Sequence, residues 1–424
     1  MLELNRLPRR VKLPTFTQVL MIVAEYAWAI LVILNGNSVF HAASYEKYHL
    51  LEYSVVMTYL LLGMELYIHR IRPPWKTLVL SVGLLVYCMV YVAARQSSMS
   101  VVNFVYLFVL GLPALFLLFS IRHSRGRLIP LFRRLCDVLV VLAPISLYYW
   151  LFAVNMRWIP PNCYIVIDWG YRRYVMGFDQ LQYAVQIDST FFPEAFIYRN
   201  SSLFTEAPMY NLWLDIALAG ELFLRERTSR FRVVLLVITI LSTMSVTGML
   251  YLALCLLLHL VRKYPTMERS QKRATMLLGV VAIPALVVGL VVAMTMKSDT
   301  QSYSMRLSDY VAGFKLWLDE PIFGAGYANL QALLPYMYSP DGILGFSNSL
   351  TAVLGTGGVW ISLLFYIPQF GALSPKLTGD SRLSYFAICY LFLFCTTAFF
   401  GRYVVVVMAA FTMALIFDPS KLRL

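Results

Sequence analysis

The sequence contains few charged residues. Only 13% of its 424 residues are Asp, Glu, Lys or Arg, whereas 60% are hydrophobic, and the mean hydropathy is +0.69. Soluble domains are about a quarter charged, so this composition excludes a chain of soluble domains. The apolar residues form runs of about 17 to 25 residues, the length at which a helix crosses a bilayer. The sequence therefore predicts an all-α, polytopic membrane protein, with residues 1–424 forming a single integral-membrane domain.

Cysteine is also scarce. The chain has six cysteines and no CxxC pair, and only Cys163 falls in a predicted long loop. This pattern excludes a disulfide framework and a zinc site, so we expect no metal. The net charge of +13 does not indicate nucleic acid as a partner, because Lys and Arg cluster at the ends of apolar runs.

The apolar runs predict about twelve transmembrane helices. Single spans are expected near residues 14–35, 49–68, 76–94, 101–120, 135–154, 208–224, 275–296 and 347–367. Two longer stretches, 231–261 and 383–418, must each contain two spans. The first is basic at both ends and is interrupted by STMSVTG, and the second is interrupted by Gly401 and Arg402. Because basic loops stay in the cytoplasm, a stretch with two basic ends must cross the membrane twice.

This topology places both termini in the cytoplasm. Cytoplasmic segments then hold 25 of the 35 Lys and Arg residues, as the positive-inside rule requires. The basic N-terminus precedes an apolar run too long for a signal-peptide core, so we expect an uncleaved first helix. Residues 155–207 and 297–346 remain as long external loops, in which we expect short amphipathic helices. Connections between packed helices are usually short, and long loops often carry function.

Both external loops contain basic residues against the charge bias. The first has Arg157, Arg172, Arg173 and Arg199, and the second has Arg306 and Lys315. The planar guanidinium of arginine pairs bidentately with phosphate oxygens, which favours an anionic substrate at the outer face. In the alternative interpretation, each arginine pairs with a nearby Asp or Glu. Neither loop contains a DxD motif that would hold a divalent cation.

The stretch RLSDYVAGFKLWLDEP, residues 306–321, predicts an amphipathic helix in the membrane interface. Arg306 and Asp309 share one face of it, one turn apart. Pro321 ends the helix, and Gly324 and Gly326 allow the chain to turn back. A dinucleotide fingerprint needs a preceding strand and a third glycine, and both are lacking. We interpret the glycine turn as structural, with direct contact to a phosphate as the alternative.

Three segments resemble, in order, the superfamily of O-antigen polymerases and O-antigen ligases. YRNSSLFTEAPMYN, residues 198–211, is similar to the family's Arg, Phe and Glu-x-Pro segment that enters a helix. STMSVTG resembles the family's Ser-rich tip between two short helices. Arg306 stands fifteen residues before Pro321 of EPIFGAGY, and LGTGG follows, as in the family's C-terminal signature. Together these segments cover about half of the chain.

The resemblance implies a GT-C-like glycosyltransferase in the bacterial inner (plasma) membrane, with its active site facing the periplasm or exterior. Its donor and acceptor would be oligosaccharides carried on undecaprenyl pyrophosphate, and no cofactor is implied. Membrane lipid is a further expected partner, and a chain-length regulator protein is a candidate one. The leading hypothesis is a polymerase that transfers the growing glycan, with inversion, to the non-reducing end of a lipid-linked repeat unit.

Charge grows on the departing pyrophosphate as the sugar is transferred, and fixed cations stabilise that charge. We expect Arg199 and Arg306 to bind it, and the secondary candidates are Arg172, Arg173 and Arg402. Tyr198, Asn348, Gly324 and Gly326 are further candidates for substrate contact.

The acceptor hydroxyl requires a base or an orienting acceptor. Many family members carry a His-Asn pair where this chain has Ser347 and Asn348, and none of its five histidines lies in a long external loop. Glu206 is the first candidate base and Asp309 the second, although Glu206 is equally suited to orient Arg199 through a salt bridge.

Two other functions remain open. A ligase would deliver the glycan to a lipid A core, and the missing histidine argues against it. A lipid-linked oligosaccharide flippase would need charges along a central cavity, whereas the predicted spans contain few. These include Glu25, Glu65, Asp215 and Glu221.

Overall fold

We analysed a computed structural model of the chain. The structure describes residues 16–44, 48–169, 171–188, 191, 193–270, 272–273, 301–337 and 346–417. The span expected near 275–296 lies outside the described residues.

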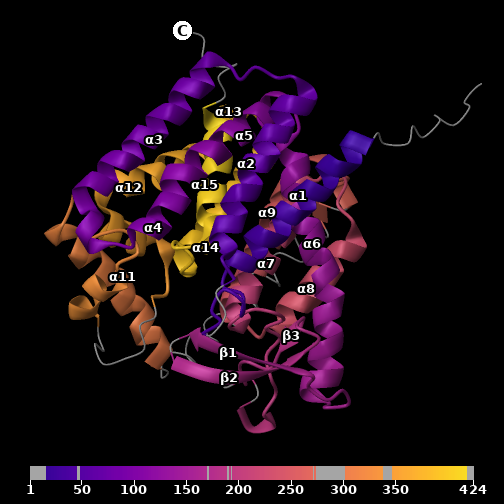
Figure 1. Cartoon of the computed structure of the whole chain (residues 1–424). Helices are drawn as coiled ribbons and strands as arrows, with labels where there is room; N and C mark the ends of the chain where they lie inside the picture. Colours follow the sequence, from indigo (N-terminus) through magenta and orange to yellow (C-terminus); the bar gives the residue numbers. More distant parts are fainter. Residues whose placement is uncertain are drawn as a thin grey trace, which may run out of the picture.

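The described chain is mostly helical (Figure 1). Its first seven α-helices are α1 (Phe16–Asn35), α2 (Leu50–His69), α3 (Trp75–Arg95), α4 (Val101–Phe104), α5 (Leu112–Ser124), α6 (Leu128–Tyr148) and α7 (Ala207–Ala219). The later ones are α8 (Arg230–Ser242), α9 (Val246–Lys263), α11 (Gln301–Asp319), α12 (Ser349–Ala372), α13 (Pro375–Thr378), α14 (Ser381–Thr396) and α15 (Tyr403–Ile416). Three π-helical segments extend or join them: η2 (Val105–Gly111), η3 (Tyr149–Asn155) and η5 (Gly220–Leu224). Short 3₁₀ turns are η1 (Gln96–Ser98), η4 (Pro193–Ala195), η6 (Tyr264–Thr266) and η7 (Leu330–Tyr336).

Within the described residues, seven helices are long and apolar enough to cross a membrane, and α14 and α15 are shorter apolar helices. The chain is therefore a multi-pass membrane protein. The total of twelve spans remains a prediction, because part of the chain lies outside the residues that the structure describes. Both predicted interruptions are present, because α8 and α9 are separate helices and so are α14 and α15.

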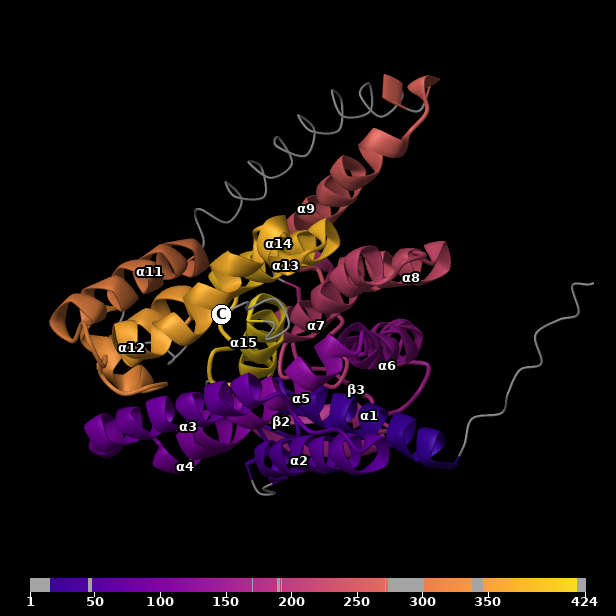
Figure 2. The ribbon, with the colours of Figure 1, turned by 90° about the horizontal axis from the view of Figure 1, so that it is seen from above.

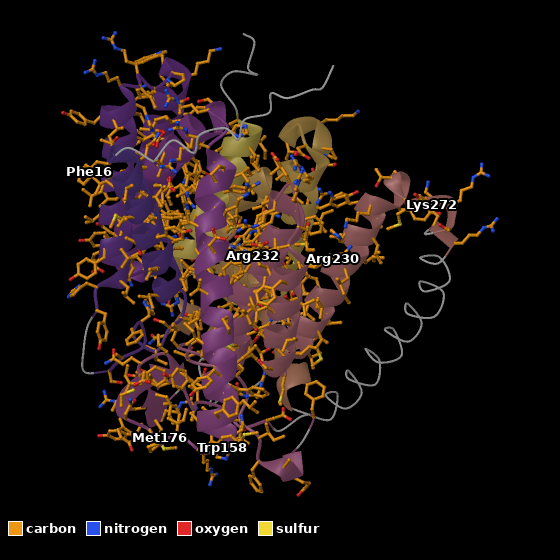
Figure 3. All side chains as sticks on the ribbon, turned by 90° about the vertical axis from the view of Figure 1, so that its right-hand side faces the viewer. Phe16, Trp158, Met176, Arg230, Arg232 and Lys272 are labelled. Atoms are coloured by element: carbon orange, nitrogen blue, oxygen red, sulfur yellow. The ribbon has the colours of Figure 1, made fainter. Side chains whose placement is uncertain are left out.

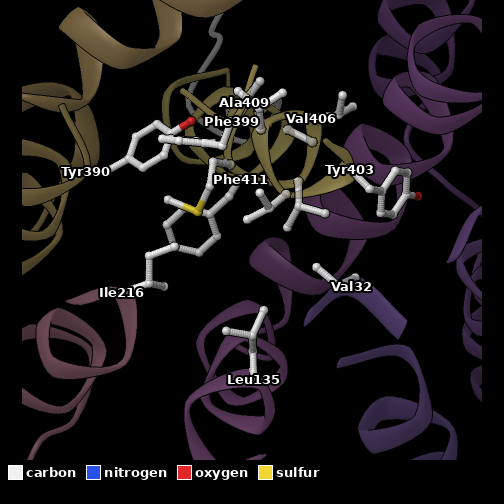
Figure 4. Close-up of a cluster of buried hydrophobic side chains, with 14 of the residues drawn as sticks. Val32, Leu135, Ile216, Tyr390, Phe399, Tyr403, Val406, Ala409 and Phe411 are labelled. Atoms are coloured by element: carbon white, nitrogen blue, oxygen red, sulfur yellow. The ribbon is translucent and has the colours of Figure 1, made fainter. Parts of the chain in front are cut away.

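Helix α15 forms the centre of the bundle (Figure 2). Every side chain from Tyr403 to Leu415 is buried, although the helix has only 14 residues. Figure 4 shows Val406 and Phe411 of α15 among residues of other helices, including Leu135 and Ile216. A helix that is apolar on all sides is shielded from water and lipid alike by its neighbours. Here α5 and α12 pack directly against it.

Helix α1 ends beside the start of α15. The backbone N–H of Tyr403 donates to Asn35 Oδ1 at 2.8 Å. Because α1 leads towards this contact and α15 leads away from it, the Phe16 and Ile416 ends lie at the other end of the bundle. In Figure 1 that end carries α13, and the small β-sheet lies at the opposite end.

Three of the four acids noted within the spans form ion pairs with arginines. Arg122 donates to Glu25 at 2.6 Å and lies 3.0 Å from Glu65. Glu221 pairs with Arg225 at 2.6 Å and with Arg232 at 3.0 Å. In Figure 3, Arg230 and Arg232 lie well away from Trp158 and Met176 at the sheet end. Buried carboxylates are tolerated when they are paired in this way.

The first external loop contains strands, so the expectation of short amphipathic helices in an all-α chain was wrong for residues 155–207. Strands β1 (Cys163–Trp169), β2 (Tyr171–Phe178) and β3 (Gln182–Tyr183) form an antiparallel sheet in the order β1-β2-β3. The cause is the period of two: Ile167 and Val175 are buried, whereas Tyr164 and Tyr174 are exposed. The sheet is held to the segment after α1 by a bridge between Ala43 and Ile167.

The second external loop contains the amphipathic helix α11. Its exposed apolar side chains are Leu307, Val311, Phe314 and Leu318, and its buried side includes Asp309, Ala312 and Leu316. An exposed apolar stripe beside a packed face is typical of a helix in the membrane interface. The buried side packs on α12, where Gly313 and Gly355 bring the two backbones together.

The chain turns after α11 at Gly324 and Gly326, whose φ angles are +66° and +100°. A Cβ at Gly324 would lie 2.4 Å from the backbone nitrogen of Gly358, at the point where α12 is interrupted. The N–H groups of Val359 and Trp360 donate to the carbonyls of Pro321 and Ile322, each at 2.9 Å. The turn therefore serves backbone packing, as interpreted from the sequence.

We predict that Gly324→Ala destabilises the protein strongly. A non-glycine residue with this φ costs about 1 to 2 kcal/mol, and the added methyl group would clash with backbone atoms. The melting temperature in detergent should fall by several degrees, and the yield of monodisperse protein should fall with it. Gly63→Ala is the matched control, because a Cβ at Gly63 meets nothing within 4 Å. Equal melting temperatures for the two variants would contradict the packing role.

Candidate functional site

Two arginines from the two segments predicted as external loops reach the same turn. We define the α8–α9 turn as residues 243–247, which join the C-terminal end of α8 to the first turn of α9. Arg199 Nε donates to the carbonyl oxygen of Thr243 at 2.9 Å. Arg306 Nη1 donates to Thr247 Oγ1 at 3.4 Å. The structure thus brings together the two cations selected from the sequence as pyrophosphate ligands.

The polar sequence STMSVTG explains why the turn forms here. Thr243 and Met244 close α8 through hydrogen bonds to Ile240 and Leu241, and Met244 adopts a φ of +48°. Ser245 then begins α9, and its side chain accepts a hydrogen bond from the Gly248 N–H at 3.4 Å. Serine is a preferred residue at this first position because its oxygen satisfies an otherwise free N–H.

Arg199 is held in place from both sides. Its backbone N–H donates to the Gln186 carbonyl at 2.9 Å, and the next residue, Asn200, donates to the Ser242 carbonyl at 3.0 Å. Burial lowers the pKa of the Arg199 guanidinium, and the charges of Asp188 and Glu206 act in the opposite direction. The side chain therefore remains a cation whose solvation by water has been partly replaced by protein groups.

Glu206 lies at the start of α7, where its backbone is extended with φ of −164°. Its charge stabilises the cationic form of Arg199. This arrangement supports the interpretation of Glu206 as a residue that orients Arg199. Its first-ranked role as the base stays a prediction.

Asp309 stands one helical turn after Arg306 and is 3% exposed. Its Oδ2 accepts the backbone N–H of Ser347 at 2.9 Å. Burial raises the pKa of Asp309, whereas the hydrogen bond from Ser347 and the charge of Arg306 lower it. The raised pKa makes this carboxylate a better proton acceptor than an ordinary aspartate.

Asn348 has a structural partner in the next turn of helix. Its Oδ1 caps α12 by accepting the Thr351 N–H at 2.9 Å and the Thr351 hydroxyl at 3.0 Å. Its Nδ2 is buried and has no hydrogen-bond partner among the residues that the structure describes. The amide therefore retains a donor at the start of α12, next to the contact between Ser347 and Asp309.

Arg402 lies immediately before α15, and its guanidinium donates a hydrogen bond to His41 Nε2. Burial lowers the pKa of Arg402 to about 10. Burial, followed by the charge of Arg402, lowers the pKa of His41 to about 3, so His41 is neutral at physiological pH. This histidine was not among the candidates predicted from the sequence, most of which lie in the two long loops. His41 belongs to the shorter connection between α1 and α2.

The remaining candidates lie elsewhere. Arg172 is exposed on β2, opposite Asp168 of β1, and Arg173 reaches the Thr205 carbonyl at 3.4 Å. The backbone of Tyr198 pairs with Asn155, whose Oδ1 accepts its N–H at 2.8 Å. Gly324 and Gly326 follow the C-terminal end of α11, whereas Arg306 lies near its N-terminal end. With a rise of 1.5 Å per residue, Arg306 is about 20 Å along the helix from its last residue. Their proposed contact with phosphate stays a prediction.

The fold and the site define a class: a multi-pass membrane protein in which two segments, far apart in the sequence, each deliver an arginine to one turn between two helices. Residues 231–366, about a third of the chain, match the family model described as O-antigen ligase. The matched range includes the turn, α11 and most of α12, and with them Arg306 and Asp309. The match supports the resemblance to the superfamily of O-antigen ligases and polymerases, whose members are glycosyltransferase-like enzymes. No curated protein matches the sequence significantly.

The contact between His41 and Arg402 generates a prediction about stability at acid pH. The folded pKa of about 3 is below the usual 6.5, so between these values the unfolded chain binds a proton that the folded chain does not. The contribution of neutral His41 to the free energy of unfolding is therefore fully present above pH 6.5. It decreases as the pH falls towards 3, by at most about 1.4 kcal/mol per pH unit. His41→Gln keeps an acceptor and removes the titration. Its melting temperature should fall less between pH 7.5 and 5 than that of the wild type.

Proposed function

We propose that this protein is a polysaccharide polymerase that transfers a glycan from undecaprenyl pyrophosphate to the non-reducing end of a lipid-linked repeat unit. The observation that carries the proposal is the convergence of Arg199 and Arg306 on the α8–α9 turn. One lies in a loop of the N-terminal half and the other in α11, so only the folded chain brings them together. The O-antigen ligase match supports the same class of substrate.

The reaction requires stabilisation of a diphosphate that leaves with its lipid. The acceptor hydroxyl attacks the anomeric carbon, the bond from that carbon to the bridging oxygen breaks, and its electron pair stays on the diphosphate. In the proposed step, Arg199 and Arg306 donate to the diphosphate oxygens, so the growing negative charge meets two fixed cations. Attack from the face opposite the leaving group inverts the anomeric centre.

The hydroxyl proton must pass to a base. We assign this role to Asp309, because its pKa is raised and it stands one turn from Arg306. Glu206 is assigned to orienting Arg199, which reverses the ranking drawn from the sequence. Neutral Asp309 would then return its proton to water as undecaprenyl pyrophosphate leaves.

Arg402 and His41 form a second polar contact at the end of the bundle that carries the sheet. A ligase is the closest alternative function, since the matching family model carries that description. The neutral His41 provides an imidazole near Arg402, but it comes from the α1–α2 connection and not from the start of α12. Polymerase therefore remains the preferred function.

The accumulation product in a deletion strain tests the choice of function. A surface glycan capped with a single repeat unit is expected for a polymerase. Polymer that remains on the carrier with none transferred would indicate a ligase, and carrier trapped on the cytoplasmic side would indicate a flippase.

Arg199→Ala and Arg306→Ala should each reduce the rate of transfer. A hydrogen bond to a charged group contributes about 1.5 to 3 kcal/mol, which corresponds to a loss of roughly 10- to 150-fold in rate. Chain length and yield are measured in the complemented deletion strain, together with the amount of folded protein in the membrane. Lys315→Ala is the matched control, because Lys315 is an exposed cation on the same helix as Arg306. Wild-type polymer from either arginine variant would remove that residue from the mechanism.

Asp309 generates a prediction about pH. A base must be ionised, so the rate should fall as the pH decreases through the pKa of Asp309, which is raised above the usual 3.8. In the profile of rate against pH, the fall on the acid side should therefore occur at a higher pH than an ordinary aspartate would give. Asp309→Asn should be much slower and should lack this fall, whereas Glu206→Gln should keep it. If Glu206→Gln alone loses the fall, Glu206 is the base.

A further inference from the structure

Asp215 differs from the other three acids noted within the predicted spans. It lies in the interior of α7 and is 0% exposed. Glu25, Glu65 and Glu221 pair with arginines, whereas Asp215 has no ion pair within the described part of the chain. An ionisable side chain inside a membrane protein is costly and usually has a function.

A chain of hydrogen bonds connects Asp215 to the proposed diphosphate site. Asp215 Oδ2 accepts from Asn211 Nδ2 at 2.6 Å. Asn211 Oδ1 in turn lies 3.3 Å from the Thr243 hydroxyl, whose proton it shares with the Ile240 carbonyl at 2.7 Å. The carbonyl of the same Thr243 accepts from Arg199 Nε. Asp215, Asn211 and Thr243 are all buried, so water does not compete for these contacts.

The other side of the turn is fitted to the same amide. A Cβ at Gly248 would lie 2.1 Å from Asn211 Oδ1, so only glycine leaves space for the Asn211 side chain. Gly248 also donates its N–H to Ser245 and follows Thr247, the residue that Arg306 contacts. The Asn211 amide therefore lies against both the end of α8 and the start of α9.

We propose that Asp215 is a positioning residue, which sets the orientation of the Asn211 amide and thereby the position of the α8–α9 turn that holds Arg199. An amide side chain has an acceptor oxygen on one side and a donor NH₂ group on the other. The surrounding hydrogen-bond partners determine the direction in which each group points. Asp215 takes the NH₂ group, so the oxygen faces Thr243. Without that acceptor the NH₂ group would be buried and unsatisfied, and the amide would rotate or move. This inference rests on the proposed function.

Binding of inorganic pyrophosphate to the purified full-length protein in detergent tests the proposal by isothermal titration calorimetry. Asp215→Leu should weaken binding roughly tenfold. Asp215→Asn keeps the size and an acceptor oxygen, so its affinity should stay within about threefold of the wild type. Thr243→Val removes the hydroxyl that Asn211 accepts and keeps the carbonyl that Arg199 contacts. It should weaken binding in the same direction as Asp215→Leu, and it serves as the second test if Asp215→Leu does not fold.

A double-mutant cycle distinguishes positioning from general stability. Asp215→Leu should add little to the loss caused by Arg199→Ala, because both act through Thr243. Its effect should be additive with that of Arg402→Ala, because Arg402 does not belong to the row of contacts from Asp215 to Arg199. Thr412→Val is the control and should bind pyrophosphate as the wild type does. Thr412 is buried on α15, and among the described residues its hydroxyl bonds only to carbonyls of its own helix.

The outcomes separate the two proposals. If Arg199→Ala leaves pyrophosphate binding unchanged, the proposed function fails. If Arg199→Ala weakens binding while Asp215→Leu and Thr243→Val do not, only the role of Asp215 is overturned. Equal losses from Asp215→Leu and Asp215→Asn, or additivity with Arg199→Ala, would also overturn it.

Discussion

The attachment of two guanidinium groups to the α8–α9 turn is the constraint on which the proposed site depends. Arg199 binds the carbonyl at the end of α8, and Arg306 binds a hydroxyl at the start of α9. Each also has a carboxylate nearby, Glu206 or Asp309, so the site holds cations without leaving them unsolvated. Cations that are fixed before the substrate arrives stabilise a developing diphosphate without reorganisation, which is the main source of rate in this type of chemistry.

The membrane environment explains why the interior of the bundle contains few polar groups. A polar group in the bundle interior must find its partner within the protein, since no water is present to replace it. At one end of the bundle, carboxylates are paired with arginines such as Arg122 and Arg225. Towards the other end, Asp215 Oδ2 accepts a hydrogen bond from Asn211, which lies against the turn. The apolar helix α15 runs through the centre of the bundle from one end towards the other, and its side chains from Tyr403 to Leu415 are buried.

The sequence predicted much of the fold and part of the site. Spans such as α1 and α12, the break between α8 and α9, and the glycine turn after α11 all follow from local patterns of hydropathy and of helix-ending residues. The sheet was missed because the expectation for this loop rested on its length and not on the alternation around Ile165 and Val175. His41 was missed because a histidine in a short connection has no local signature of function, and its partner Arg402 is 361 residues away.

By itself, the sequence determined that the chain is a membrane protein, where many of its apolar helices lie, and that arginines stand in the long segments between them. These properties depend on the composition of short segments, and the free energy of transfer to lipid acts on each segment separately. Only the tertiary structure decided that Arg199 and Arg306 reach one turn, that Asp215 supports it through Asn211, and that Gly324 packs on α12 at a distance from the site. Such contacts depend on how helices far apart in the sequence pack against each other, and no local pattern encodes that packing.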